Sequence, residues 1–160
     1  MADFAAQDCA LFLWVTDPLL PRAIELIQAW RFEYKTVGFY WVKLNAKVKH
    51  SADYFTGLGY WTRANPEQCL LATRGKPMRR AKDVRRLVVE SRREHSRKPE
   101  CVRDHIERLV DGPYLELFAR ETKPGWDCLG NQVGLFDQGT VATRRQPSRL
   151  VEETPLSLLL

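Results

Sequence analysis

The sequence predicts a single α/β domain built on a mostly parallel sheet. Short apolar runs of strand length alternate with segments in which apolar residues recur at helical spacing. The chain has 160 residues, of which 44% are hydrophobic, and is therefore long enough to enclose one core. We expect the domain to cover residues 1–136. Apolar periodicity fades after Phe136, so we expect residues 137–160 to form a disordered tail.

The first three expected elements form a strand–helix–strand unit. Residues 9–15, CALFLWV, are continuously apolar, as expected of a strand buried on both faces. A helix follows, with Pro18 and Pro21 near its start and apolar residues at helical spacing up to Trp30. Residues 34–43, YKTVGFYWVK, are rich in aromatic and β-branched residues and predict the next strand.

Three further strands and one helix are expected beyond an irregular segment. Residues 44–60 are polar and contain glycine, which favours a functional loop. Pro99 opens a helix that extends to Val110, where Asp-Gly-Pro ends it. The remaining apolar runs predict strands at residues 68–74, 84–90 and 114–120. Residues 121–133, ETKPGWDCLGNQV, are expected to form a loop that contains Trp126.

Composition and motifs exclude several classes of protein. The sequence contains no apolar run of about 18 residues and no charged-then-apolar leader, so we expect a cytoplasmic protein without a membrane span. The four cysteines form no Cys-x-x-Cys pair, and no further ligand joins Cys101 and His105, so no metal site is predicted. Dinucleotide, P-loop and α/β-hydrolase motifs are absent from the sequence.

Positive charge is concentrated in one window of the chain. The net charge is +5, but residues 74–98 contain eleven Lys or Arg residues and three acidic residues, and carry +8. A basic surface suits a phosphate backbone, because neutralised phosphates release counterions. A solvated charged loop fits this composition equally well. The residues that we predict for nucleic-acid contact in this window are Arg79, Arg80, Arg85 and Arg93.

Two loops that follow predicted strands are candidate ligand-binding segments, because open α/β sheets bind ligands beyond the carboxyl ends of their strands. Lys98 stands directly before the proline that opens the second helix, where backbone N–H groups and the ammonium group can hold a carboxylate or phosphate. An exposed cation without a ligand is the alternative. Asn131 and Gln132 are two adjacent amides after a glycine, which suits either a simple turn or a hydrogen-bonding face for a small molecule.

Four segments together resemble the adenine N(6)-methyltransferase family named for the seventy-kilodalton subunit of the messenger-RNA adenosine methyltransferase. They are residues 9–43, 57–77, 93–109 and 114–133. The motifs HSRKP and LFAR…PGW…GNQ are most similar to the bacterial and phage branch of that family. The resemblance implies a Rossmann-like sheet, S-adenosylmethionine as cofactor, and methyl transfer to the exocyclic amine of adenine.

The resemblance also implies roles for individual residues. Phe118 is expected to pack beside the cofactor, and Arg120 to reach the hydroxyls of its nucleoside. The amides of Asn131 and Gln132 are expected to face the ribose and adenine. Lys98 is expected to lie near the methionine carboxylate and the reacting centre.

The second matched segment is expected to contribute to the surface that meets the substrate or a partner. There, Trp61 and Glu67 match family positions on that surface. The segment 44–60 corresponds to the family's mobile loop over the target adenine.

One motif of the family does not occur in this sequence. The family's Asp-Pro-Pro-Trp ends a strand that precedes the matched region, and Thr16-Asp17-Pro18-Leu19 follows a different strand. In the family, that tetrapeptide orients the target amine and holds the flipped base. The catalytic residues are therefore unknown, and we expect the sheet to lack its N-terminal strands. Cofactor binding can survive without the motif, whereas methyl transfer should not.

Two functions follow as hypotheses. The first is adenine methylation in nucleic acid, with DNA preferred over RNA, in which a missing N-terminal half or a partner subunit supplies the absent motif. The alternative is a non-catalytic nucleic-acid-binding subunit of a methyltransferase complex. The retained Asn131 and Gln132 favour the first hypothesis, and the missing tetrapeptide favours the second.

Overall fold

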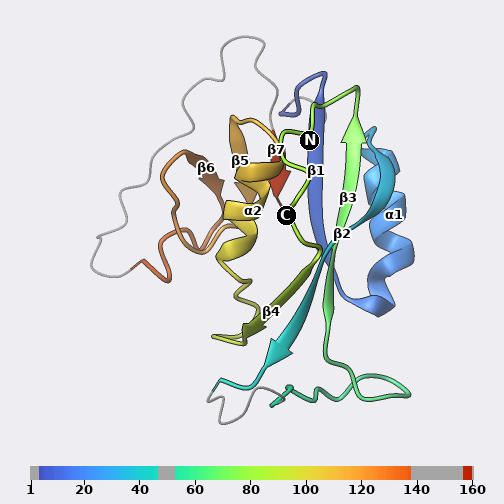
Figure 1. The fold of residues 1–160 in the computed structure, drawn as a ribbon, viewed down its shortest axis with the longest axis vertical. Helices are drawn as coiled ribbons and strands as arrows, with labels where there is room; N and C mark the ends of the chain where they lie inside the picture. Colours follow the sequence, from blue (N-terminus) through green and yellow to red (C-terminus); the bar gives the residue numbers. More distant parts are fainter. Residues whose placement is uncertain (1–3, 47–52, 138–156, 160) are drawn as a thin grey trace.

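The computed structural model describes residues 4–46, 53–137 and 157–159. The first half contains β1 (Cys9–Val15), the short 3-10 helix η1 (Asp17–Leu19), α1 (Leu20–Ala29), β2 (Glu33–Leu44) and β3 (Glu67–Arg74). The second half contains β4 (Leu87–Ser91), α2 (Cys101–Leu109), β5 (Tyr114–Leu117), β6 (Trp126–Leu129) and β7 (Ser157–Leu159). The described strands form one sheet in the order β4-β2-β3-β1-β7-β5-β6 (Figure 1).

The sheet is mixed, and four of its six described strand pairings are parallel, as predicted. Strand β3 runs antiparallel to both of its neighbours, β1 and β2. The pairings β2–β4, β1–β7, β5–β7 and β5–β6 are parallel. The predicted α/β class is therefore confirmed. The two strands of the predicted strand–helix–strand unit, β1 and β2, are not neighbours in the sheet, because β3 lies between them. Strand β3 follows β2 in the sequence and pairs with it antiparallel. Sequence periodicity gives no information on the direction in which two strands pair.

The two helices cover opposite faces of the sheet. Alternate residues of β1 belong to two separate cores, because successive side chains of a strand point to opposite faces. Leu11 packs in a cluster with Ile27 of α1, and Phe12 packs in another with Ile106 of α2. All of β1 except Trp14 is therefore buried, which explains its continuous apolar sequence.

Several predicted boundaries are corrected by the structure. Strand β5 ends at Leu117 rather than at residue 120, because Phe118 has a left-handed backbone that leaves the sheet. The predicted loop around Trp126 contains strand β6. The Trp126 ring stacks on Tyr114 with centroids 4.8 Å apart, and its Nε1 donates to Glu107 over 2.6 Å. These tertiary contacts hold a strand of four residues, which is too short to show a period.

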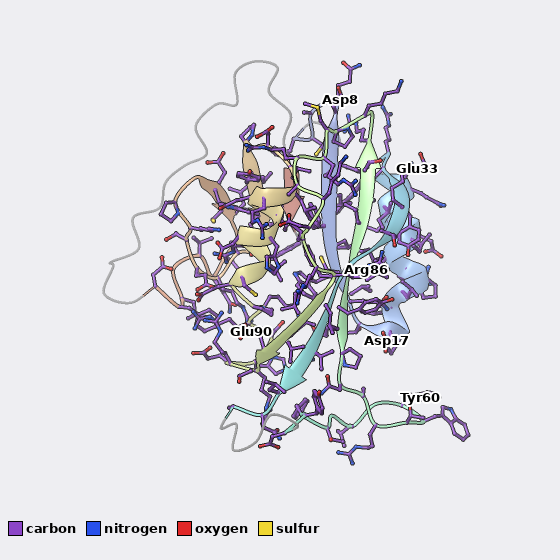
Figure 2. The ribbon with its side chains drawn as sticks, viewed as in Figure 1. Asp8, Asp17, Glu33, Tyr60, Arg86 and Glu90 are labelled. Carbon is purple, nitrogen blue, oxygen red and sulfur yellow. The ribbon has the colours of Figure 1, made fainter. Side chains whose placement is uncertain are left out.

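The remaining expectations are tested only in part. The predicted tail lies mostly outside the described residues, but residues 157–159 form β7 between β1 and β5. The predicted loop 44–60 is irregular where it is described, apart from one bridge between Leu44 and Tyr54. Tyr60 lies at the tip of a segment that projects from one end of the sheet (Figure 2). None of the described helices is long and apolar enough to cross a membrane.

Candidate functional site

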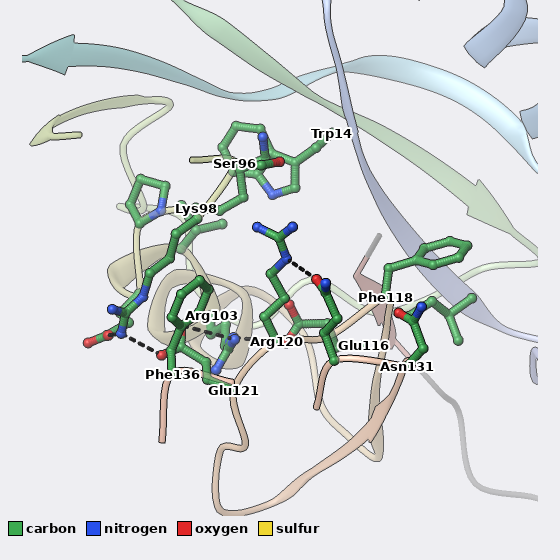
Figure 3. A pocket seen from close by; sticks show the side chains of 16 residues that line it. Trp14, Ser96, Lys98, Arg103, Glu116, Phe118, Arg120, Glu121, Asn131 and Phe136 are labelled. Carbon is green, nitrogen blue, oxygen red and sulfur yellow. Dashed lines mark hydrogen bonds and ion pairs between the residues drawn. The ribbon is translucent and has the colours of Figure 1, made fainter. Parts of the chain in front are cut away.

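A pocket of about 380 Å³ lies where the loops after β5 and β6 meet the segment that leads into α2 (Figure 3). This volume falls within the range of small-molecule sites, roughly 300–1,000 Å³. All five residues that the sequence predicted for cofactor binding line it: Lys98, Phe118, Arg120, Asn131 and Gln132. Residues up to 34 positions apart along the chain are thus brought to one cavity, while their individual roles stay predictions.

Two residues on the pocket wall have an unusual backbone conformation. Ser96 and Phe118 have φ angles of 64° and 60°, in the left-handed region that few non-glycine residues adopt. Such conformations are costly, and they concentrate at ligand sites because the surrounding structure must hold them. At Phe118 the turn out of β5 leaves the aromatic residue 79% exposed beside the pocket. The ring is therefore available for stacking.

Gly130 permits the close packing that places the two amides. A side chain at this position would bring its Cβ within 2.8 Å of the backbone oxygen of Ala119 and 3.0 Å of its nitrogen. The backbone N–H of Ala119 also donates to the carbonyl of Leu129 over 3.0 Å. Only glycine lets the loops after β5 and β6 approach this closely. Asn131 and Gln132 are consequently held on the pocket wall.

Arg120 ties three segments of the pocket together. Its Nε donates to Oε1 of Gln132 over 2.9 Å (Figure 3), and its Nη1 donates to the carbonyl oxygen of His95 over 2.7 Å. The planar guanidinium presents donors in a fixed geometry, so both contacts orient it. The loops after β5 and β6 are thereby linked to the segment before α2.

A partly buried ion-pair network forms one side of the pocket. Arg97 contacts Glu121 over 2.8 Å, and Arg103 contacts Glu116 over 3.0 Å and Glu121 over 3.5 Å. The four side chains are 10–16% exposed. Burial raises the pKa of the Glu116 carboxyl, and the positive charge of Arg103 offsets only part of that effect. The alternating charges compensate one another, so the network adds polarity without a large net charge.

Lys98 lines the pocket and also contacts the carboxylate of Glu67, which lies outside the pocket lining. Its ammonium donates to Glu67, which also accepts a hydrogen bond from Lys43 over 2.6 Å. Burial alone would raise the pKa of the Glu67 carboxyl, but the hydrogen bonds and positive charges of the two lysines outweigh it and hold that pKa below its ordinary value. The Lys98 ammonium also lies 5.5 Å from the centroid of the Trp14 ring. Lys98 therefore links the pocket to Glu67, whose side chain is 17% exposed. The role of Glu67 on a surface that meets a substrate or partner stays a prediction.

Sequence reasoning missed Trp14 and the ion-pair network. Trp14 lines the pocket near the carboxyl end of β1, and its buried Nε1 has no hydrogen-bond partner among the described residues. A tryptophan one residue before the end of a continuously apolar strand was a usable signal, since strand ends border the crevice. The partners of Arg97 and Arg103 had no such signal, because they depend on contacts between distant segments.

The residues predicted for nucleic-acid contact are not gathered at one place. Trp61 is 91% exposed on the projecting segment between β2 and β3, and its ring packs edge-on against Tyr60. Arg79, Arg80 and Arg85 are exposed on the segment between β3 and β4.

Part of the basic window is engaged in ion pairs. Arg80 contacts Asp111 over 2.7 Å, and Arg93 contacts Glu100 over 2.6 Å. Within the described ranges, no group of three His, Cys, Asp or Glu side chains is placed to hold a metal ion.

The structure is thus an α/β domain with a pocket beside the carboxyl ends of its strands, which is where open α/β sheets bind small molecules. The family model MT-A70 matches residues 1–132, and the chain belongs to the MT-A70 family. The resemblance inferred from the four sequence segments is thus confirmed.

Three relatives illustrate the match. The type II methyltransferase M.MunI of Mycoplasma sp is 37% identical over 144 residues, which cover 85% of this chain and 58% of that protein. The human N(6)-adenosine-methyltransferase catalytic subunit METTL3 is 33% identical over 148 residues, which cover 88% of this chain and 25% of that protein. The mouse N(6)-adenine-specific methyltransferase METTL4 is 33% identical over 150 residues, which cover 82% of this chain and 30% of that protein. This chain spans just over half of M.MunI and less than a third of the other two.

Proposed function

We propose that this chain forms the S-adenosylmethionine-binding part of an enzyme that methylates the exocyclic amine of adenine in nucleic acid. The observation that supports this most directly is the gathering of Lys98, Phe118, Arg120, Asn131 and Gln132 around one pocket, in a chain of the MT-A70 family. The cytoplasmic location expected from the sequence is part of the same proposal.

The pocket offers groups that match each part of the cofactor. The exposed ring of Phe118 suits stacking against adenine, and the amides of Asn131 and Gln132 can both donate to and accept from adenine and ribose. Arg120, whose guanidinium is held by Gln132, is the donor that we assign to the ribose hydroxyls. Lys98 supplies a positive charge for the methionine carboxylate. Bound there, S-adenosylmethionine supplies a methyl group activated by a positively charged sulfur.

The acceptor side of the reaction requires groups beyond those of the pocket. The lone pair of the adenine amine is delocalised into the ring, so acceptors must orient that amine and an aromatic side chain must hold the flipped base. The sequence contains no Asp-Pro-Pro-Trp for this task. In the proposed enzyme, a preceding segment of a longer polypeptide or a partner subunit supplies it.

DNA is the proposed substrate in preference to RNA. The motifs resemble the bacterial and phage branch, and the identity to the bacterial M.MunI, 37%, exceeds the 33% to human METTL3. Matched DNA and RNA oligonucleotides carrying the same sequence decide between the two in a binding titration.

The second candidate is a non-catalytic nucleic-acid-binding subunit. The exposed Tyr60 and Trp61 favour it, because aromatic rings on a projecting segment can stack on unpaired bases while arginines on another segment contact phosphates. Under this proposal, nucleic-acid affinity falls steeply with salt and weakens when Arg79, Arg80 and Arg85 are reversed in charge. A nucleic-acid affinity that depends neither on salt nor on these charge reversals contradicts this second candidate.

Calorimetry with S-adenosylmethionine tests the first candidate. Replacing Asn131 and Gln132 together with alanine should weaken binding by about ten- to a hundred-fold, since each lost hydrogen bond contributes roughly 0.5–1.5 kcal/mol. Gln28→Ala, which removes an exposed amide on α1, is the matched control and should leave binding unchanged. If the wild-type chain does not bind the cofactor, or if the double variant binds it equally well, the cofactor assignment fails.

A further inference from the structure

Strand β4 lies at one edge of the sheet (Figure 1). It pairs in parallel with β2, and no described strand lies on its other side. The backbone N–H of Tyr40 donates to the carbonyl oxygen of Arg86 over 3.0 Å, so even-numbered residues at β4 turn their backbone groups toward β2. The odd-numbered residues Leu87, Val89 and Ser91 therefore present their backbone groups to the open edge. Such an edge is a template for pairing with another strand.

The open edge also carries exposed apolar side chains. Leu87 is 57% exposed and Val89 is 44% exposed, and both point to one face because alternate residues of a strand do so. Tyr40, which lies opposite Leu87 on β2, is 37% exposed. Val88 points to the other face and is buried in the core beside α2. Strand β4 is therefore anchored on one face and leaves an apolar strip uncovered on the other.

The charges at the two ends of this strip are complementary to a second copy of the same strand. Arg86 directly precedes β4, and Glu90 lies near its end (Figure 2). When two copies of β4 run antiparallel about Val88, Arg86 of each copy lies opposite Glu90 of the other. Leu87 of each then lies opposite Val89 of the other. Opposite charges and apolar pairs that face each other across two strands stabilise the pairing.

The two neighbouring registers lack this complementarity. Centred on Val89, the antiparallel pair places Arg86 opposite Arg92, so that like charges face each other. Centred on Leu87, it places both Arg86 and Glu90 opposite valines. Shifts by a single position would pair residues that face the edge with residues that face β2. The sequence of β4 therefore favours the register centred on Val88.

We propose that the open edge of β4 is a docking surface for a second copy of this chain, which pairs its own β4 antiparallel in the register centred on Val88. A two-fold axis then relates the copies, so each contact occurs twice. Arg86 exchanges an exposed hydrogen bond to Thr36, 3.2 Å long, for a stronger contact with a carboxylate. The inference is independent of the proposed function, because no residue of β4 lines the candidate cofactor pocket.

Sedimentation equilibrium on the full chain tests this docking surface. Paired edge strands bury little area and small interfaces are weak, so the dissociation constant of the dimer should be on the order of 100 µM. A chain that stays monomeric up to about 500 µM assigns the edge to another occupant and overturns the proposal.

Reversal of charge tests the register. Arg86→Glu and Glu90→Arg each place like charges opposite each other at both contacts, so each should weaken self-association by at least about tenfold. An equimolar mixture of the two variants restores opposite charges at both contacts and should associate within about threefold of the wild type. Arg85→Glu is the matched control, because Arg85 lies opposite the uncharged Ser91 in this register. Its effect should stay below about threefold.

A proline at the open edge tests the pairing without relying on charge. Val89→Pro removes an N–H that faces the open edge and leaves the donors to β2 in place, so the variant should stay folded by circular dichroism and lose self-association. The charge variants keep every backbone donor and decide the matter if this variant does not fold. No recovery in the mixture, tighter association of Arg86→Glu, or a folded Val89→Pro chain that dimerises like the wild type overturns the proposal.

Discussion

Glu121 should stabilise the side of the pocket on which the ion-pair network lies. Its carboxylate contacts Arg97 over 2.8 Å and Arg103 over 3.5 Å, and its side chain is only 13% exposed. Glu121→Gln keeps the shape of the side chain but removes its negative charge. Two partly buried guanidinium groups then lose one compensating charge.

The expected cost follows from the partners that remain. Breaking a buried ion pair on one side typically costs about 3–5 kcal/mol, because a charge stays buried without compensation. Here Arg97 keeps two more exposed carboxylates, Glu94 and Glu100, and Arg103 keeps Glu116. The introduced amide also retains an oxygen acceptor. We therefore expect a loss of about 2 kcal/mol in the free energy of unfolding, below the range for a fully isolated charge.

Urea unfolding at pH 7, followed by tryptophan fluorescence, measures this loss. Glu25→Gln is the matched control, because the Arg22–Glu25 pair has the same 2.8 Å separation but lies on the exposed surface of α1. Exposed pairs contribute roughly 0–1 kcal/mol, so the control should change stability by no more than about 0.5 kcal/mol. If the two variants lose the same amount, the network does not contribute through buried charge, and the reasoning fails.

Three other predictions concern single residues. The pKa of Glu67 is lower in the folded chain, so its ionised form contributes stability that is present above its ordinary pKa of 4.5 and is lost as the pH falls through the folded pKa. In acid unfolding curves, the difference in stability between the wild type and Glu67→Gln should therefore shrink as the pH falls below 4.5. Trp126→Ala should cost about 3–5 kcal/mol in urea unfolding and Trp61→Ala no more than about 0.5 kcal/mol, because only the first ring is buried; equal losses would contradict the burial argument. Gly130→Ala should weaken S-adenosylmethionine binding several-fold in calorimetry. Gly125→Ala, which adds backbone strain at a φ of 83° but brings its Cβ within 4 Å of no atom, should leave binding unchanged. Unchanged binding in both would show that close packing does not place the amides.

The sequence alone determined the elements whose signal is local. The first predicted strand, residues 9–15, matches β1 at both ends, because seven consecutive apolar residues bounded by polar ones leave little choice. The helix before Val110 was predicted from its opening proline and apolar face, although α2 begins two residues after that proline. The family was likewise predicted from four ordered segments and is confirmed by the match over residues 1–132.

The five predicted cofactor residues were named from the sequence, but only the tertiary structure places them around one cavity. The mixed sheet, the strand at Trp126 and the place of β7 also required it, because strand pairing joins residues that are distant along the chain. The same is true of the network formed by Arg97, Arg103 and their carboxylates, since each partner lies on another segment. Composition and periodicity report what each residue prefers locally, whereas these features depend on which distant residues become neighbours.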